Sequence, residues 1–374
     1  MGEGELLVET SEGECPAVRD AAPRRWQRAT IAALACMGVA AAVWSTSSSG
    51  TQLAEMHKGA ATEELFNMIS GQARKGSFIV LGDWGYDAQS HGNLASAQCQ
   101  KSIAARMLQT FTELGDVKFI VNVGDSFYPG GVSDKNDPQW QAKWRNVYAP
   151  ELRSVPWYSV YGNHDYHKDP CACTTDVSKC AQVNTDINNK EFFYMPAPYW
   201  YLEHPELDME VIALDTNEYM WAWDKNPAAA SKGFQDCEWT PCKETCFGIA
   251  ANRAQASFNL FYDRMKKSTA KNLLVFSHYP TDYFWSVPAF IDGLSASRSI
   301  TYYGGHRHNV DNTSTLKTGQ NPNWLAGGGG GWSCEGLSYS NPPAQGFVVG
   351  EIAADGTVTT RSVLIDAEKD CCYR

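Results

Sequence analysis

The sequence has no surplus of basic residues. It contains 31 Lys and Arg against 42 Asp and Glu in 374 residues, a formal net charge of -11. A nucleic-acid binder is therefore not expected, because such proteins need a basic surface for the phosphate backbone. Internal repeats are also absent, and a composition of 43% hydrophobic and 20% charged residues excludes collagen-like, coiled-coil and largely disordered chains. One large or two modest globular domains are expected.

Two further absences concern motifs. The glycine run 327–331 is not followed by Lys and Ser or Thr, so we expect a tight loop whose backbone approaches the site, and not a phosphate-binding loop. Cys237, Cys242 and Cys246 lie close together. No matching pair of His or Cys follows them at the spacing of a zinc finger or zinc ribbon, which argues against a zinc cluster.

Cysteine itself is plentiful, with 12 residues. All but Cys15 and Cys36 lie downstream of the apolar segment 29–44, and their even number favours several disulfides formed in an oxidising compartment. Buried free thiols are the alternative. The stretches 168–190 and 217–247 are rich in cysteine and polar residues without periodicity, so both are predicted to be long loops joined by disulfides.

The N-terminus contains one apolar segment but no long one. Residues 29–44 follow three arginines and, as a helix, would extend about 24 Å, less than the roughly 30 Å of a bilayer core. We predict a cytoplasmic tail (1–28), a signal-anchor or signal-peptide segment (29–44), a stem (45–75) and one domain (76–370). Both fates of the segment stay open: a type II membrane protein with a luminal or extracellular domain, or a secreted protein. Asn312-Thr313-Ser314 is a glycosylation sequon in that compartment.

The body alternates strands with helices. Residues 94–114 are predicted to be a crossover helix, 254–268 a second helix, and 346–365 a hairpin around Asp355-Gly356. The continuous apolar character of the strands predicts an α/β sheet covered on both faces, with ligands at the carboxyl ends of the strands. Six segments are predicted to be strands that end in polar residues: 77–81, 118–123, 155–161, 211–214, 272–276 and 299–303.

The polar residues after these strands form a set of metal donors. Seven hard or borderline ligands suit two metal ions that share one carboxylate. The spacing of the residues within each cluster also allows their side chains to converge on one place. His306 and His308, for example, point to the same side of an extended chain. The seven are Asp83, Asp125, Tyr128, Asn163, His278, His306 and His308.

These clusters make the sequence similar to the metallophosphoesterases and, within them, to the purple acid phosphatases of the small, tartrate-resistant kind. The resemblance covers about residues 76–365 and rests on five motifs. They are Gly-Asp-x-Gly at 82–85, Gly-Asp-x-x-Tyr at 124–128, Gly-Asn-His-Asp at 162–165, Val-x-x-His at 275–278 and Gly-His-x-His at 305–308.

The resemblance implies a four-layer α/β/β/α sandwich and two ligand sets. One ion would take Asp83, Asp125, Tyr128 and His308, and the other Asp125, Asn163, His278 and His306. Because a phenol is a poor donor at acid pH unless a trivalent ion displaces its proton, Tyr128 favours Fe(III). The family's partner ion is Fe(II), Zn or Mn.

The implied activity is hydrolysis of phosphate monoesters by a metal-bound hydroxide. His164 would hydrogen-bond the substrate and protonate the leaving alcohol, with Asp165 a possible orienting group. Small members of the family usually carry another histidine after His-Tyr-Pro, and residues 281–300 contain none. Leaving-group protonation would then fall to His164 alone or to a substitute such as Tyr283 or Asp292.

Two other functions stay open. One is a catalytically silent member that serves as a membrane anchor or receptor. The N-terminal segment and the missing histidine favour this alternative. The other is a phosphodiesterase or nucleotidase of the same superfamily, but Gly85 and Tyr128 replace the His and Asp that those branches usually carry.

Overall fold

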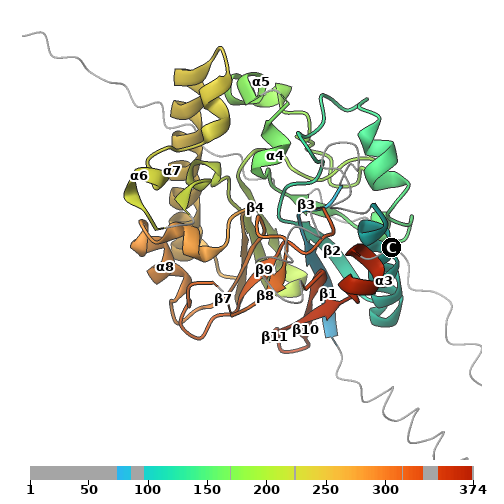
Figure 1. Cartoon of the computed structure of the whole chain (residues 1–374). Helices are drawn as coiled ribbons and strands as arrows, with labels where there is room; N and C mark the ends of the chain where they lie inside the picture. The colour runs from blue at the N-terminus through green and yellow to red at the C-terminus, as the bar shows by residue number, and fades with distance from the viewer. Residues whose placement is uncertain are drawn as a thin grey trace, which may run out of the picture. The chain divides into compact units, whose positions relative to one another are not determined.

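Two mixed β-sheets form the centre of the protein in the computed structural model (Figure 1). The structure describes residues 74–85, 97–168, 170–222, 225–313, 315–331 and 344–372, which all belong to one compact unit, Arg74–Arg374. The predicted tail, signal-anchor segment and most of the stem lie outside these residues. Within the described part of the chain, no helix combines the length and the apolar character needed to cross a membrane.

The first sheet has five strands in the order β11-β10-β1-β2-β3. Strands β1 (Arg74–Leu81), β2 (Val117–Asn122) and β3 (Trp157–Ser159) run parallel to one another. The hairpin of β10 (Gly346–Ala353) and β11 (Val358–Leu364) adds to β1 in the antiparallel direction. The predicted hairpin is thereby confirmed.

The second sheet has six strands in the order β4-β5-β6-β7-β9-β8. Its four central strands are parallel, and β4 and β8 pair with their neighbours in the antiparallel direction. The strands are β4 (Trp200–His204), β5 (Met209–Ala213), β6 (Asn272–Phe276), β7 (Ser299–Gly304), β8 (Val310–Asp311) and β9 (Asn323–Ala326).

The side chains of β1 alternate between two apolar layers. Phe78 and Val80 belong to the core between the two sheets, whereas Ile79 and Leu81 belong to the core beneath helix α3 (Ala97–Leu114). Since successive residues of a strand point to opposite faces, a strand covered on both sides is apolar throughout. The α/β prediction and the crossover helix between β1 and β2 are confirmed.

The second sheet is built in the same way. Leu274 and Phe276 of β6 face the core between the sheets, and Leu273 and Val275 face a third core under α7 (Lys243–Lys267) and α8 (Pro288–Leu294). Figure 1 shows α3 outside the first sheet and α7 and α8 outside the second. The predicted order of helix, sheet, sheet and helix is therefore confirmed.

Several boundaries differ from the sequence prediction. Helix α7 begins at Lys243, well before the predicted start at residue 254, because its first turns are held by disulfides and have no clear apolar period. Strands β4, β8 and β9 were not predicted, since they are short and lie at or near the end of the sheet. The remaining helices are short: α4 (Asn163–Tyr166), α5 (Pro170–Thr175), α6 (Pro227–Ala230), η2 (Trp140–Arg145), η3 (Leu152–Ser154), η4 (Val177–Lys179), η5 (Pro205–Leu207), η6 (Asn217–Tyr219), η8 (Gln235–Trp239), η9 (Thr281–Phe284) and η11 (Glu368–Cys372).

Four disulfides confirm the interpretation of the cysteines. They are Cys99–Cys371, Cys171–Cys242, Cys173–Cys180 and Cys237–Cys246. Cys171–Cys242 joins the two stretches predicted to be cross-linked loops, whereas Cys173–Cys180 lies within the first stretch and Cys237–Cys246 within the second. In the structure these stretches contain several of the short helices. Disulfides of this number fit a protein that folds in an oxidising, secretory or extracellular compartment.

Candidate metal centre

All seven predicted donors follow the carboxyl ends of strands. Asp83 follows β1, Asp125 and Tyr128 follow β2, and Asn163 opens α4 after β3. In the second sheet, His278 follows β6, and His306 and His308 follow β7. The structure brings all seven side chains to one place, and apart from the partly exposed His306 and His308 they are buried.

The first group of donors surrounds the Tyr128 hydroxyl. Its oxygen lies 3.1 Å from Asp125 Oδ2, 3.3 Å from Asp83 Oδ1 and 3.3 Å from His308 Nε2. His308 Nε2 lies 3.8 Å from Asp83 Oδ1. These four side chains are the set that the family resemblance implies for one ion.

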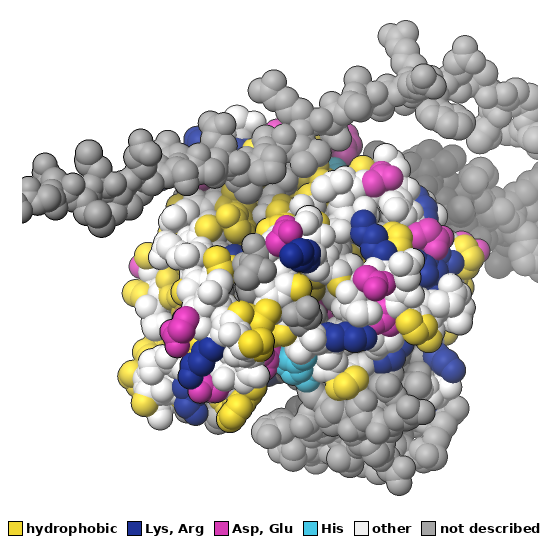
Figure 2. Space-filling view, turned by 90° about the horizontal axis from the view of Figure 1, so that it is seen from above, with side chains coloured by type: hydrophobic (Ala, Val, Ile, Leu, Met, Phe, Trp, Pro, Cys, Tyr) yellow, Lys and Arg dark blue, Asp and Glu magenta, His cyan; other side chains and the backbone are white. Residues whose placement is uncertain are grey.

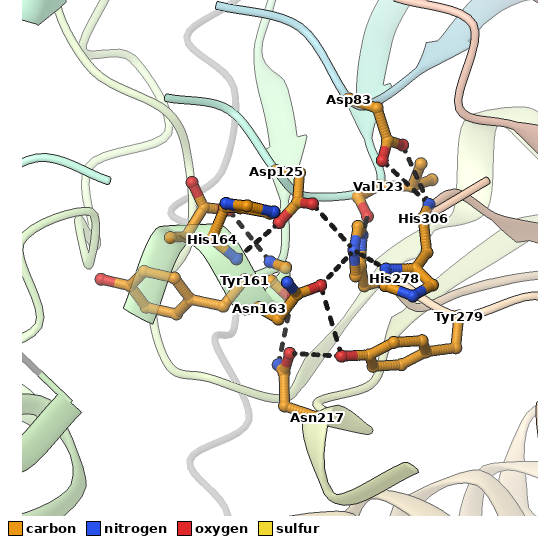
Figure 3. A network of polar contacts seen from close by, with 12 residues as sticks. Asp83, Val123, Asp125, Tyr161, Asn163, His164, Asn217, His278, Tyr279 and His306 are labelled. Atoms are coloured by element: carbon orange, nitrogen blue, oxygen red, sulfur yellow. Dashed lines mark hydrogen bonds and ion pairs between the residues drawn. The ribbon is translucent and has the colours of Figure 1, made fainter. Parts of the chain in front are cut away.

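The second group surrounds His278 Nε2 and is shown in Figure 3. This nitrogen lies 3.2 Å from Asn163 Oδ1, 3.3 Å from Asp125 Oδ2 and 3.3 Å from His306 Nδ1. Atoms of Asp125, His278 and His306 all lie within 4.8 Å of one another. Asp125 Oδ2 takes part in both groups, as a bridging carboxylate would.

The spacing and chemistry of these atoms fit metal ions. Ligands about 2.1 Å from one ion lie about 3.0 to 3.4 Å apart at octahedral or tetrahedral angles. His278 Nδ1 lies 2.9 Å from the Val123 carbonyl oxygen. Because a carbonyl only accepts, Nδ1 carries a proton, and in the neutral ring, the form that binds a metal, the Nε2 lone pair is directed at the other donors. The donor set therefore suits a dinuclear metal centre.

The backbone at these donors is held in an unusual conformation. Asp83, Asp125 and His306 have φ angles of 57°, 51° and 69°, in the left-handed region that side chains other than glycine rarely adopt. His306 N–H donates to both Asp83 oxygens at 3.0 Å. Such local strain persists where the surroundings fix it, and it is concentrated at functional sites.

Glycines let the backbone approach the two aspartates closely. A Cβ on Gly162 would lie 2.1 Å from Asp125 Oδ1, and one on Gly305 would lie 2.4 Å from Asp83 Oδ2. The run 327–331 behaves in the same way, because a Cβ on Gly327 would lie 2.7 Å from Asp83 Oδ2. The predicted close approach of this run to the site is confirmed.

Burial and charge shift the pKa values of the donors in the protein without metal. Burial raises the pKa of Asp83 to about 7. Burial lowers the pKa of His278, but the charges of Asp125 and Asp83 and the hydrogen bonds to Asp125 and Val123 together outweigh it and raise this pKa to about 9. Burial also opposes the charge of Asp125, but the neighbouring histidines, His278 first, hold its pKa well below its usual range. Positive charge at this place is thus stabilised by two buried carboxyl groups.

His164 lies beside the first group. Its ring is 4.7 Å from the Tyr128 ring, and its backbone N–H donates to Asp125 Oδ1 at 2.9 Å. Its Nδ1 is 2.6 Å from the Pro129 carbonyl, which leaves Nε2 as the nitrogen without the proton in the neutral ring. Burial lowers the pKa of His164 to about 4.

Asp165 fixes the loop around His164. Its carboxylate accepts hydrogen bonds from Gly162 N and Ser126 N at 2.9 Å and from Gln182 Nε2 at 2.8 Å. The role of Asp165 in orienting the His164 ring stays a prediction, and its described contacts show a role in the loop. The carboxylate ties the loop after β3 to the loop after β2, which holds Asn163 near Asp125.

The two suggested substitutes for the missing histidine differ in position. Tyr283 is buried, and its ring packs at 5.3 Å against the His306 ring. Asp292 is exposed on α8. Tyr283 is therefore at the site, whereas nothing in the described contacts brings Asp292 to it.

Sequence reasoning missed the residues behind Asn163. Tyr279 donates to Asn217 Oδ1 at 3.3 Å (Figure 3). Asn217 in turn donates to Asp215 Oδ1 at 2.8 Å. The Tyr279 hydroxyl also lies 3.5 Å from Asn163 Oδ1. The polar end of β5 at Asp215-Thr216 was the one signal of this network in the sequence.

Comparison with known proteins agrees with this geometry. The family model described as calcineurin-like phosphoesterase matches residues 76–327. Purple acid phosphatase 3 of Arabidopsis thaliana is 36% identical over 110 residues, 29% of this chain and 28% of the relative. Tartrate-resistant acid phosphatase type 5 of Mus musculus is 26% identical over 246 residues, 62% of this chain and 66% of the relative. The chain thus matches less than two thirds of the length of either relative.

A solved structure described as GAP50, the anchor in the inner membrane complex of Plasmodium, has a TM-score of 0.47 and 19% identity, covering 77% of this chain and 84% of that one. The family model, the two sheets and the five motifs together confirm the resemblance found in the sequence, and the chain belongs to the calcineurin-like phosphoesterase family.

Proposed function

We propose that the protein is an acid phosphatase that hydrolyses phosphate monoesters at a dinuclear metal centre. The observation that carries this proposal is the pair of donor groups that share Asp125 Oδ2. Supporting evidence comes from the family, whose members act on phosphate esters, and from the curated relatives, which are purple acid phosphatases and tartrate-resistant acid phosphatases.

The two groups suggest which residues would hold which ion. Asp83, Asp125, Tyr128 and His308 would bind Fe(III), and Asp125, Asn163, His278 and His306 would bind Fe(II), Zn or Mn. Tyr128 supports the trivalent ion, because burial holds the pKa of this phenol well above its ordinary value and only a strong Lewis acid would displace the proton. When bound, two such ions polarise a phosphate ester and make a coordinated water acidic.

His164 would act on the leaving-group side. Its Nδ1–H is held by the Pro129 carbonyl, so Nε2 is the nitrogen that can face the substrate. In the imidazolium form, Nε2–H would donate a hydrogen bond to the ester oxygen and give the departing alcohol its proton. The contact between Asp125 Oδ1 and the His164 backbone fixes this imidazole relative to the bridging carboxylate.

We also propose that residues 29–44 direct the body of the protein into the secretory pathway, as a signal-anchor or a cleaved signal peptide. The four disulfides support an oxidising destination. Asn312, the sequon residue, is exposed in the structure and is accessible for glycosylation.

The decisive experiment is hydrolysis of 4-nitrophenyl phosphate at acid pH by the full chain loaded with iron and zinc. Wild type should turn over, and Asp125→Ala should lower kcat by about 1,000-fold or more, because it removes the donor common to both groups. Asp355→Asn, at the exposed turn of the β10–β11 hairpin, is the matched control and should keep full activity.

Two outcomes would contradict the proposal. Wild-type protein with verified metal content that hydrolyses no ester would point to the catalytically silent alternative. A higher kcat/KM on bis-(4-nitrophenyl) phosphate than on the monoester would point to a phosphodiesterase.

A further inference from the structure

Arg307 stands between the two donors of the Gly-His-x-His motif and has no role in the proposed chemistry. Its Nη2 donates to Asp282 Oδ1 at 2.7 Å, and its side chain is 35% exposed. Its Nε–H is buried without a hydrogen-bond partner among the described residues. An unpaired donor on a guanidinium is costly to bury, which suggests that a ligand completes its hydrogen bonds.

Asp282, the partner of this guanidinium, is the chain neighbour of Tyr283, whose ring contacts the candidate metal centre. Tyr283 packs at 5.3 Å against the His306 ring on one side. It belongs to the same short helix, η9, as Asp282, the partner of Arg307. The Arg307–Asp282 pair therefore lies at the edge of the centre and not within it.

The edge carries charged side chains of both signs (Figure 2). Burial raises the pKa of Asp282, while Arg307 and Lys225 both counteract this rise. Two basic side chains thus act on a single carboxylate. Figure 2, which views the molecule from above, shows histidine side chains (cyan) that reach the surface among basic (dark blue) and acidic (magenta) ones.

We propose that Arg307 binds a second, non-reacting anionic group of the substrate, and that Asp282 occupies the guanidinium until that group arrives. The site would therefore prefer phosphate monoesters that carry a nearby carboxylate or second phosphate over neutral alkyl phosphates. Arginine suits this task, because its donors match either anion in a bidentate manner. This inference rests on the proposed phosphatase function and specifies its substrate class.

The test compares kcat/KM for three phosphate compounds in the metal-loaded full chain. Ethyl phosphate has no second anion, 2-phosphoglycolate has a carboxylate, and inorganic diphosphate has a second phosphate. Wild type should prefer the last two. The loss of rate on each of them in Arg307→Gln tells which anion fits better, because the difference in leaving group cancels between wild type and variant. Arg307→Gln should lower that preference about tenfold or more and leave ethyl phosphate nearly unchanged, as expected for the loss of a charged hydrogen bond.

Asp282→Asn is the second variant and should act in the opposite direction. It removes the carboxylate that competes for Arg307, so the preference for 2-phosphoglycolate and diphosphate should increase several-fold. Arg298→Gln is the matched control: this arginine binds backbone carbonyls at the end of α7 and should change neither rate.

Binding provides a readout that does not need catalysis. Calorimetry should show phosphonoacetate binding more tightly than ethylphosphonate, with the difference lost in Arg307→Gln and enlarged in Asp282→Asn. The inference is overturned if Arg307→Gln changes the affinity for both ligands equally or the affinity for neither. If wild type hydrolyses nothing but the binding difference follows these variants, the phosphatase proposal fails and the anion site stands.

Discussion

At the residue scale, the centre depends on positions without a side chain. A Cβ on Gly162 would lie 2.1 Å from Asp125 Oδ1 and 2.5 Å from Asp125 N, so an alanine there must displace the bridging carboxylate. We expect Gly162→Ala to lose bound iron and at least about 100-fold in kcat, since misplaced ligands weaken both metal binding and catalysis. Metal analysis and the hydrolysis assay measure the two effects.

A matched glycine supplies the control. Gly248 lies exposed within α7, and a Cβ there would meet nothing within 4 Å. Gly248→Ala should keep metal and activity and stabilise the fold by up to about 1 kcal/mol, because glycine is a poor residue in a helix interior. Full metal content in Gly162→Ala would mean that the loop after β3 can move to accommodate the added Cβ, which would contradict the close packing seen in the structure.

Tyr128 tests the identity of the first ion. Tyr128→Phe removes the only phenol of the proposed donor set and should abolish the visible absorption band that a phenolate gives with Fe(III). Tyr283→Phe is the control, because Tyr283 packs against His306 but is outside the set. An unchanged band in Tyr128→Phe would contradict the assignment of iron to this group.

The sequence was sufficient for the donors but not for their neighbours. Asp83, Asp125 and His278 were predicted because each lies in a short motif directly after a strand. The ends of neighbouring strands meet at one edge of a sheet, so such motifs lie close together in the fold. Arg307 and Asp282 meet across the ends of two strands, and only side-chain directions bring them together. Asn217 behind Asn163 escaped prediction for the same reason.

At the element scale, Asp137 organises the segment between β2 and η2. Its side chain is buried, and its Oδ2 accepts hydrogen bonds from Ser133 N at 2.9 Å and Lys168 Nζ at 2.8 Å, while Oδ1 accepts from Gln139 N at 3.0 Å. Burial opposes the charge, but Lys168 and the backbone donors together hold the pKa of Asp137 below its ordinary range.

This carboxylate should make stability depend on pH. Because its folded pKa is below the unfolded value of about 3.9, it stabilises the protein above that pH and loses the contribution as pH falls further. Asp137→Asn should cost about 1 to 3 kcal/mol at neutral pH and clearly less at about pH 2, measured by urea unfolding, since the contribution shrinks as pH falls below the unfolded pKa and is fully lost only below the folded one. The exposed Asp134→Asn serves as control. An equal cost at both pH values would contradict the role of the charge.

Strands and helices could be predicted where their burial gives a clear pattern of apolar residues in the sequence. Strands β1, β2, β5, β6 and β7 are buried on both faces, so each reads as an apolar run that ends in polar residues. Helix α7 extends well before its predicted start because its first turns are held by cross-links to neighbouring loops. Disulfide pairing could not be read from spacing, since it depends on distances between loops.

At the scale of the whole molecule, the Cys99–Cys371 disulfide joins the first described helix, α3, to the C-terminal η11. It spans 272 residues of sequence, whereas Cys173–Cys180 spans 7. A cross-link restricts the unfolded chain more when the loop it closes is longer, and loop entropy gives about 5.5 kcal/mol for the first and about 2.4 kcal/mol for the second. Both pairs are buried in the folded protein.

Replacing both cysteines of each pair by alanine should therefore show which disulfide contributes more to the free energy of unfolding. Cys99→Ala with Cys371→Ala should lower the free energy of unfolding by roughly 3 kcal/mol more than Cys173→Ala with Cys180→Ala, measured by urea unfolding of the full chain. Alanine leaves no buried hydroxyl to confuse the comparison. Equal losses, or a larger loss for the short loop, would mean that these cross-links act through contacts in the folded state and not by restricting the unfolded chain.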